Sequence, residues 1–133
     1  MEHGHIRASR IAEITAAHTT PGKHVTLLAG DWSERYAVAV IVLNDVMPEA
    51  EIHETAADVF SVIEGAVTFT LGGSPVNDRI AKPGEHKAEG IAGGETFRAG
   101  VGDTVSIPRG VPHQMDTRGG RVVMLITKVN DLS

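Results

Sequence analysis

The sequence has no cysteine, few aromatic residues and no concentration of positive charge. Without cysteine, the chain has no disulfides, no thiolate catalysis and no cysteine-ligated zinc. Its 12 lysines and arginines are outnumbered by 17 aspartates and glutamates, giving a formal net charge of −5. Because nucleic-acid binders depend on clustered basic residues, we expect no nucleic-acid partner, and binding to an anionic membrane is disfavoured for the same reason.

Long hydrophobic runs are also missing. No apolar stretch approaches the roughly 20 residues needed to cross a bilayer, and the N-terminus lacks the basic-then-apolar layout of a signal peptide. These features predict a cytoplasmic protein with no membrane partner. The length of 133 residues and the hydrophobic fraction of 41% fit a single domain with one buried core.

Glycine and proline, by contrast, are frequent. Fifteen glycines and six prolines separate short apolar runs, a pattern typical of many strands and few helices. One helix is expected over 9–18, where Ile11, Ile14 and His18 fall on one face. Ser9 is the expected N-cap of this helix.

Several segments have the patterning of strands. Apolar residues alternate with polar ones over 67–71 and 105–107, which predicts strands with one buried face. Residues 36–43 are all apolar, so we expect burial on both faces, either inside the fold or against a second subunit of a homodimer. The glycine-dense stretch 72–102 is predicted to be an elaborated loop with one short strand. About eight to ten short strands in all predict an antiparallel sandwich or barrel.

The residues best suited to chemistry lie in two segments far apart in the chain. Glu51 and His53 are two residues apart and therefore project from the same face of a strand. Asp58 follows after a predicted turn, on a strand expected to end at Gly65. His113 comes after a turn rich in proline and glycine. If they converge, these two imidazoles and two carboxylates suit iron, manganese, nickel or zinc.

The spacing of these residues resembles the two motifs of the cupin superfamily. The second motif, G-x5-P-x-G-x2-H-x3-N, is matched at Gly102, Pro108, Gly110 and His113, with Thr117 in place of the asparagine. The first motif, G-x5-H-x-H-x3–4-E-x6-G, is matched in spacing by Glu51, His53, Asp58 and Gly65. Here Glu51 replaces a histidine, Asp58 replaces a glutamate, and Asp45 stands where the opening glycine is expected.

The resemblance implies an all-β double-stranded β-helix, the jelly-roll cupin barrel, with a short N-terminal helix. On this basis residues 1–24 form an N-terminal segment and 25–133 the barrel domain. The resemblance also implies a divalent metal ion held by Glu51, His53, Asp58 and His113. The extra carboxylate favours Fe²⁺ or Mn²⁺, with Zn²⁺ and Ni²⁺ as alternatives.

Further roles follow from the position of these side chains inside the barrel. Glu51 and Asp58 are candidate catalytic groups that move a proton. Strand alternation predicts that the substrate pocket includes Phe60, Val62, Phe69 and Met115. Of the other histidines, His86 could hang over the barrel mouth, and His18 and His24 are expected to be ordinary surface residues. The terminal pair His3 and His5 is expected to pick up adventitious metal rather than perform chemistry.

Three functions remain open. The first choice is a non-haem iron dioxygenase acting on a small oxygen-chelating molecule. The second keeps the metal as a Lewis acid in an isomerase, epimerase or lyase. The third is a barrel that binds a small ligand without metal or catalysis. The cupin fold accommodates all three, so the fold does not decide between them.

Overall fold

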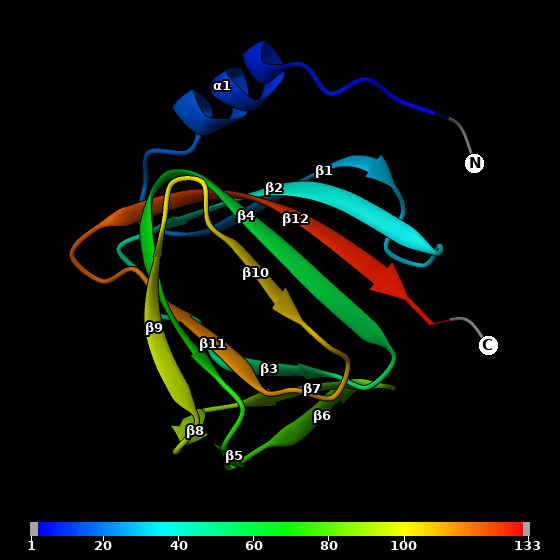
Figure 1. Cartoon of the computed structure of the whole chain (residues 1–133), viewed down its shortest axis with the longest axis vertical. Helices are drawn as coiled ribbons and strands as arrows, with labels where there is room; N and C mark the ends of the chain where they lie inside the picture. Colours follow the sequence, from blue (N-terminus) through cyan, green and yellow to red (C-terminus); the bar gives the residue numbers. More distant parts are fainter. Residues whose placement is uncertain (1–2, 132–133) are drawn as a thin grey trace.

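The computed structural model describes residues 3–131, an antiparallel β-sheet curled into a barrel with a short helix outside it (Figure 1). The elements in chain order are α1 (Ala8–Ala17), β1 (Gly22–Gly30), β2 (Tyr36–Asn44), β3 (Ala50–His53), β4 (Ala56–Leu71), β5 (Ser74–Val76), β6 (Arg79–Lys82), β7 (Glu85–Ala88), β8 (Gly90–Ala92), β9 (Glu95–Gly100), β10 (Thr104–Ile107), β11 (His113–Asp116) and β12 (Arg121–Asn130).

The long strand β4 connects the two layers of the barrel. Its first part pairs with β12 and β10, and its last part pairs with β9 and β11. The main sheet runs in the order β1-β2-β12-β4-β11-β3-β7-β6, and Figure 1 shows it folding over so that β3, β7 and β6 lie below the upper strands. The expected jelly-roll barrel is therefore confirmed.

Gly65 lies where β4 passes from one layer to the other. The sequence predicts that the strand ends here, but it continues to Leu71. At Gly65 the backbone has φ +74°, and a Cβ atom would lie 2.1 Å from the carbonyl oxygen of Arg121. Only glycine combines this left-handed conformation with so close a neighbouring strand, so Gly65 bends β4 without interrupting it.

The all-apolar strand β2 is buried on both faces within a single chain. Ile41 and Leu43 belong to the core between the layers. Val40 and Val42 point the other way and pack with Ile14 of α1. Since the protein's own helix covers the outer face of this strand, the apolar run supplies no separate argument for a dimer.

The helix begins one residue earlier than expected and lacks the predicted cap. Its N-cap is Arg7, in an extended conformation, and no side chain bonds to the first turn. Ser9 is inside the helix, so the prediction of a Ser9 cap is wrong. The helix ends at Ala17, and the backbone N–H of its C-cap, His18, donates to the carbonyl of Thr15.

The region 72–102 is not a loop but contains five strands. β5 pairs with β8, β6 and β7 form a hairpin that extends the main sheet through β3, and β9 runs along β4. Most side chains of β6 are exposed, so the sequence shows no apolar alternation there. The important consequence is that β7 lies directly beside β3.

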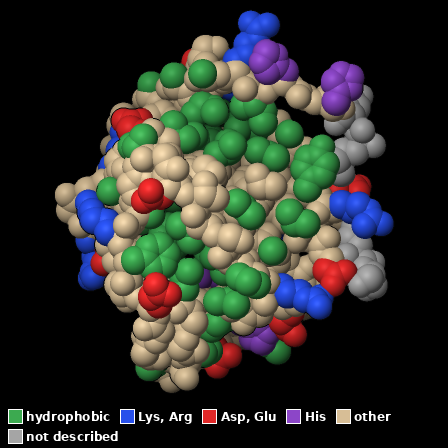
Figure 2. All heavy atoms as spheres, in the orientation of Figure 1, with side chains coloured by type: hydrophobic (Ala, Val, Ile, Leu, Met, Phe, Trp, Pro, Cys, Tyr) green, Lys and Arg blue, Asp and Glu red, His purple; other side chains and the backbone are tan. Residues whose placement is uncertain are grey.

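The surface of the molecule reflects this arrangement. Figure 2 shows hydrophobic side chains gathered beneath the helix and charged side chains spread around the outline. No helix within residues 3–131 is long and apolar enough to span a membrane.

Candidate metal centre

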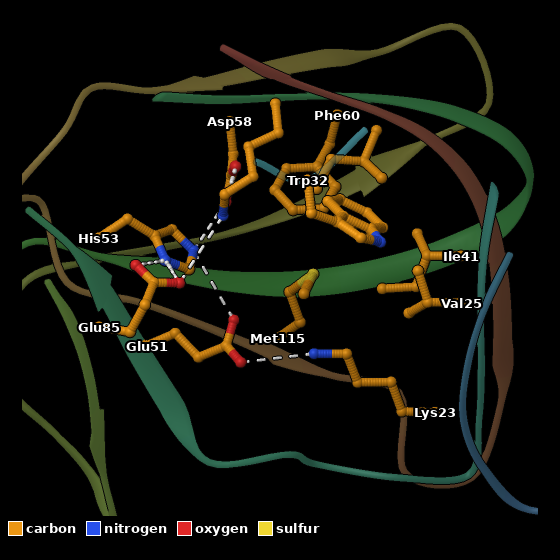
Figure 3. Close-up of a pocket in the computed structure, with 12 residues that line it drawn as sticks. Lys23, Val25, Trp32, Ile41, Glu51, His53, Asp58, Phe60, Glu85 and Met115 are labelled. Carbon is orange, nitrogen blue, oxygen red and sulfur yellow. Dashed lines mark hydrogen bonds and ion pairs between the residues drawn. The ribbon is translucent and has the colours of Figure 1, made fainter. Parts of the chain in front are cut away.

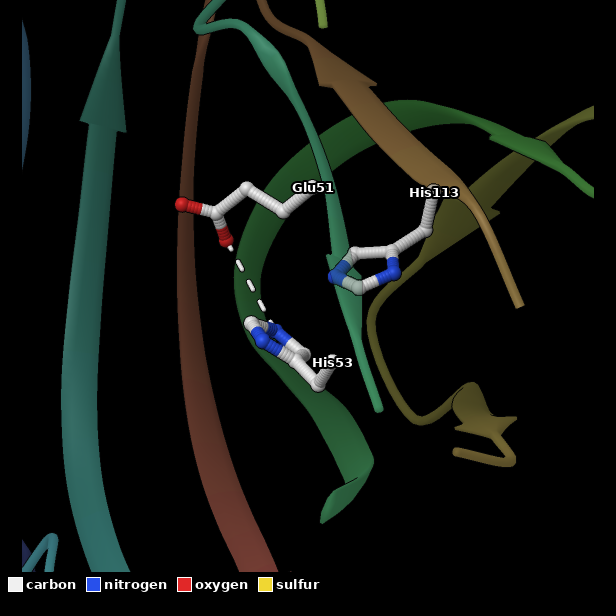
Figure 4. A group of neighbouring side chains, drawn as sticks. All are labelled: Glu51, His53 and His113. Carbon is white, nitrogen blue, oxygen red and sulfur yellow. Dashed lines mark ion pairs between the residues drawn. The ribbon is translucent and has the colours of Figure 1, made fainter. Parts of the chain in front are cut away.

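Glu51, His53 and His113 form a compact group, called here the ligand cluster. Glu51 and His53 share a face of β3, and His113 of β11 is the direct cross-strand partner of Glu51. One ligand atom from each residue lies within 4.8 Å of the others, and the two imidazole rings are 5.0 Å apart. Figure 4 shows the three side chains converging from these two strands. Strand pairing thus brings together residues that are about 60 positions apart in the chain.

His113 is set up as a neutral ligand. Its ring is buried, and Nδ1 donates a hydrogen bond to the carbonyl oxygen of Val111 at 3.0 Å. Burial lowers the pKa of the His113 imidazole. With the proton on Nδ1, the lone pair of Nε2 is free, and this nitrogen has no hydrogen-bond partner among residues 3–131. A buried, unpaired nitrogen facing two other ligand groups is suited to a metal ion.

In His53, unlike His113, both ring nitrogens face carboxylates. Its Nδ1 is 2.8 and 2.9 Å from the two carboxylate oxygens of Glu85, the cross-strand partner on β7. Its Nε2 is 3.0 Å from Oδ2 of Asp58. Burial lowers the pKa of His53, but the hydrogen bond and charge of Asp58 outweigh burial, so the net pKa is raised. Because carboxylates only accept hydrogen bonds, His53 between them holds two protons when no cation is bound.

Asp58 lies beside the ligand cluster, at the start of β4. Its carboxylate is buried, 3.5 Å from Nε2 of His113 and 3.6 Å from Nζ of Lys128, its cross-strand partner on β12. Burial raises the pKa of Asp58, but the hydrogen bond to His53 and the charges of His53 and Lys128 together lower it. The chain turns at Glu54 and Thr55, as expected, and this turn aims Asp58 at His53.

Glu51 is the most accessible member of the ligand cluster. One carboxylate oxygen lies 3.5 Å from Nζ of Lys23, and the other lies 3.8 Å from Nε2 of His53. Burial raises the pKa of Glu51, but the positive charges of Lys23 and His53 lower it overall. Glu51 is therefore a carboxylate at neutral pH and supplies a hard oxygen ligand.

These residues fit a divalent metal ion. Two imidazoles and one carboxylate are a common donor set for first-row transition metals. The structure adds that each histidine is oriented through its other ring nitrogen, His113 by a backbone carbonyl and His53 by Glu85. Such outer partners fix the tautomer and aim of a ligating imidazole.

A backbone hydrogen bond connects the second motif directly to the first. The backbone N–H of Gly110 donates to the carbonyl oxygen of His53 at 2.7 Å, so the turn before His113 rests on β3. Pro108 and Pro112 restrict the backbone on either side of this turn. The spacing of the motif therefore places His113 by a contact with the strand that carries the other ligands.

Two departures from the motif have a structural explanation. Asp45 has φ +47°, a left-handed conformation that favours glycine but that aspartate tolerates. Its carboxylate also accepts a hydrogen bond from the N–H of Gly119 at 2.7 Å. The hydroxyl of Thr117 donates to the carbonyl of Val46 and accepts from the Val46 N–H. Both positions tie the start of the first motif to the end of the second.

A pocket opens beside the ligand cluster inside the barrel mouth (Figure 3). Its cavity volume is about 170 Å³, and the pocket is partly open to solvent. Its polar lining consists of Lys23, Glu51, His53, Asp58, Glu85 and Lys128. Its apolar lining consists of Val25, Trp32, Ile41, Phe60, Met115 and Ile126. We call this space the inner pocket; its apolar lining with a few convergent polar groups suits a small organic molecule.

The four residues expected to line a substrate pocket separate into two pairs. Phe60 and Met115 line the inner pocket beside the ligand cluster. Val62 and Phe69 are buried in the core between the layers and are not part of the lining. Phe69 instead stacks on Phe97 with ring centroids 5.8 Å apart.

The remaining histidines lie outside the ligand cluster. His18 and His24 stack on each other with ring centroids 4.6 Å apart. His86 lies on β7, where Nε2 is 2.9 Å from a carboxylate oxygen of Glu54. His3 and His5 are exposed, near the N-terminus.

Sequence reasoning did not single out Glu85, Lys128 or Lys23. Glu85 reaches His53 only because β7 pairs with β3, and no pattern in the sequence marks that strand. Lys128 interrupts the apolar strand β12, which is a local signal that it faces an acidic partner. Lys23 has no such signal, since it lies at the start of β1 beside a turn.

Comparison with known proteins supports the fold and leaves the activity open. No protein-family model and no curated protein sequence matches this chain. Among solved structures it is similar to the cupin domain of Schizosaccharomyces pombe Cnp3, with 14% identity over 82% of this chain and a TM-score of 0.59. It is similar to the DMSP lyase DddQ of Ruegeria pomeroyi, with 21% identity over 84% and a TM-score of 0.59. It is also similar to a recombinant oxalate oxidase solved with glycolate, with 19% identity over 85% and a TM-score of 0.57.

These matches establish that the chain has the cupin fold. The chain spans 65% of the Cnp3 domain, 48% of the lyase and 53% of the oxidase. All three likenesses therefore concern the barrel, and at such low identity they show the fold alone.

Proposed function

We propose that the protein is a mononuclear metal-dependent enzyme acting on a small organic molecule. The observation that carries the proposal is the unpaired Nε2 of His113, buried and facing His53 and Glu51. Leaving a buried nitrogen without a partner costs free energy, on the order of 1–3 kcal/mol. A divalent cation held by the three residues removes this cost, and the adjoining inner pocket provides room for a substrate.

The first choice is a non-haem iron dioxygenase. When bound, an iron ion held by two histidines and one carboxylate supplies oxygenase chemistry, because this donor set leaves coordination positions open. The residues of the chain orient the donors: Glu85 aims His53, and the Val111 carbonyl aims His113. Phe60 and Met115 form an apolar wall beside the ligand cluster, which lowers the local dielectric constant and strengthens electrostatic interactions there. A suitable substrate is a small oxygen chelator such as an enol, catechol or diketone.

One observation favours a second candidate, a non-redox isomerase, epimerase or lyase. Asp58 lies outside the three-residue group yet lines the inner pocket. Its pKa is raised by burial but lowered further by His53 and Lys128, so it is an ionised carboxylate able to accept a proton from a substrate. In this reaction Asp58 takes the proton, and Glu51, His53 and His113 would hold a cation that supplies Lewis-acid chemistry.

Oxygen uptake separates the two candidates. The iron-loaded protein is mixed with a panel of enols, catechols and diketones in an oxygen electrode, beside His53→Ala and the control His24→Ala. A dioxygenase consumes oxygen in the wild type and the control but not in His53→Ala. If no oxygen is consumed, while the protein exchanges a substrate C–H proton with deuterated solvent and Asp58→Asn does not, the non-redox candidate is correct. Neither oxygen uptake nor proton exchange with any compound contradicts both candidates for these substrate classes.

A further inference from the structure

The inner pocket contains two lysines whose ammonium groups are not fully engaged. Lys128 is only 14% exposed, yet its Nζ is 3.6 Å from Asp58 and 3.9 Å from Glu85, both beyond hydrogen-bonding distance. Lys23 Nζ lies 3.5 Å from Glu51. Neither ammonium group makes a hydrogen bond within the part of the chain that the structure describes. Each ammonium carries three donors, so both can still bind a ligand.

The charge of the pocket changes when a metal ion binds. Three carboxylates line it, those of Glu51, Asp58 and Glu85, against the two lysines. Histidines that ligate a metal are neutral, so the polar lining alone carries one negative charge in excess. In the metal-free pocket the protonated His53 cancels this negative charge, whereas a divalent cation with His53 neutral leaves one positive charge in excess. The cation also draws on Glu51, the carboxylate that pairs with Lys23 in its absence.

The side of the inner pocket that lies away from the ligand cluster is apolar. Trp32 and Phe60 lie on this side, with Ile41 and Val25 beside them (Figure 3). Figure 3 also shows Lys23 reaching Glu51 from the side of the pocket away from Asp58. A ligand that fills this space therefore meets positive charge near the ligand cluster and hydrocarbon farther from it.

The entrance to the inner pocket is also lined by lysine side chains. A second, more polar depression shares Trp32, Glu85 and Lys128 with the inner pocket and also contains Lys82. An anion entering through this depression passes Lys82 before it reaches Lys128.

We propose that the inner pocket binds a small organic carboxylate with an apolar body, and that Lys128, aided by Lys23, binds its carboxylate group once a metal ion is present. This inference rests on the proposed metal centre and adds the substrate class to it. Metal and carboxylate binding are thereby coupled, because the cation adds positive charge to the pocket and draws Glu51 away from Lys23.

The test uses Trp32, the one tryptophan of the sequence, as a fluorescent reporter in the pocket. The protein is loaded with Zn²⁺, which has no redox chemistry, and its metal content is measured. It is then titrated with hexanoate and with its neutral analogue hexanamide, and calorimetry repeats each titration. We expect hexanoate to bind about tenfold or more tightly than hexanamide, and more tightly to the loaded than to the metal-free protein.

Variants identify the lysines. Lys128→Met should weaken hexanoate binding about tenfold at unchanged metal content, Lys128→Arg should retain most of it, and Lys23→Met should show a smaller loss. Arg10→Met, on the outer helix, removes the same charge far from the pocket and should change nothing. Because Lys23 is partly exposed, its variant serves if Lys128→Met does not fold.

The outcomes distinguish this inference from the proposed function. A wild-type protein that takes up no metal contradicts the metal centre and this inference together. A protein with one equivalent of Zn²⁺ that binds hexanoate no better than hexanamide overturns the inference and leaves the metal centre standing. The same holds if Lys128→Met and Lys23→Met both bind hexanoate as tightly as the wild type does.

Discussion

The two histidines of the ligand cluster lie 5.0 Å apart in contrasting surroundings. Around His53, on the β3–β7 side, both ring nitrogens face carboxylates, from Glu85 and Asp58. Around His113, on the β11 side, one nitrogen faces a backbone carbonyl and the other has no hydrogen-bond partner among the described residues. Accordingly, the pKa of His53 is raised by Asp58 against the effect of burial, whereas burial lowers the pKa of His113.

This contrast explains how one cluster can be stable both with and without metal. Without metal, the protonated His53 compensates the charge of the surrounding carboxylates. With metal, His53 must lose a proton, and the cation replaces that positive charge. His113 needs no such change, because it is already neutral with a free lone pair.

The largest expected effect comes from removing the anion that faces His53. Asp58→Asn leaves Lys128 and His53 without their buried partner, so the free energy of unfolding of the metal-free protein should fall by about 3 kcal/mol. Urea denaturation measures this. The control Asp116→Asn breaks an exposed pair with Arg118 and should cost less than about 1 kcal/mol. Equal costs for the two variants would mean that the charge of Asp58 is not stabilised by its surroundings.

The second-largest expected effect comes from removing Glu85, which orients the ring of His53. Glu85→Ala removes the acceptor of His53 Nδ1 and should weaken metal affinity by about tenfold or more. Glu85→Gln keeps an acceptor oxygen and should retain most of the affinity. The control Glu54→Gln alters a nearby carboxylate that pairs with His86 instead. Competition with a metal chelator gives the affinities, and an unchanged affinity in Glu85→Ala would exclude this positioning role.

The pH dependence of stability should have opposite signs for the two histidines. The raised pKa of His53 gives stability that is present below its unfolded pKa, about 6.5, and is lost as pH rises through the folded pKa. His113 has a lowered pKa, so its contribution is lost as pH falls from about 6.5 toward that folded pKa. Each proton accounts for a slope of at most about 1.4 kcal/mol per pH unit.

Urea denaturation of metal-free protein between about pH 5 and 9 measures these slopes. His53→Gln should abolish the loss above neutral pH, and His113→Gln should abolish the loss just below about pH 6.5. The same sign of change in both variants would show that the two environments do not differ as described.

The smallest effect concerns the end of the strand that carries His113. Thr117→Val removes a hydroxyl that bonds twice to Val46 and should lower the free energy of unfolding by about 1–2 kcal/mol. Thr117→Asn, the residue of the family motif, should cost less because its side chain can both donate and accept. If valine costs no more than asparagine, this tie between the motifs does not contribute to stability.

The barrel and the ligand cluster are predictable from the sequence because each leaves a local signal. Alternating apolar residues indicate the strands around Phe69 and Val105, and the motif spacing alone brings Glu51, His53 and His113 together. Within β4 the signal is incomplete, because Gly65 resembles a strand end and proves to be a bend.

The rest depends on pairing between distant strands. Glu85 has no local feature that marks it, and its role follows only from the register of β7 against β3. Within 72–102 the one expected short strand corresponds to β9, whereas the fully exposed strand β6 shows no core pattern and escapes prediction. For the same reason the two lysines of the inner pocket are recognisable only once their acidic partners are placed.

The most direct test of the account is the metal content of the protein. Tag-free wild type, His113→Ala and the control His24→Ala are purified without oxygen, reconstituted with Fe²⁺ or Mn²⁺, desalted and analysed by plasma mass spectrometry. The account predicts one equivalent of metal in the wild type and the control and essentially none in His113→Ala. No bound metal in the wild type after reconstitution, or equal metal in His113→Ala, would contradict it.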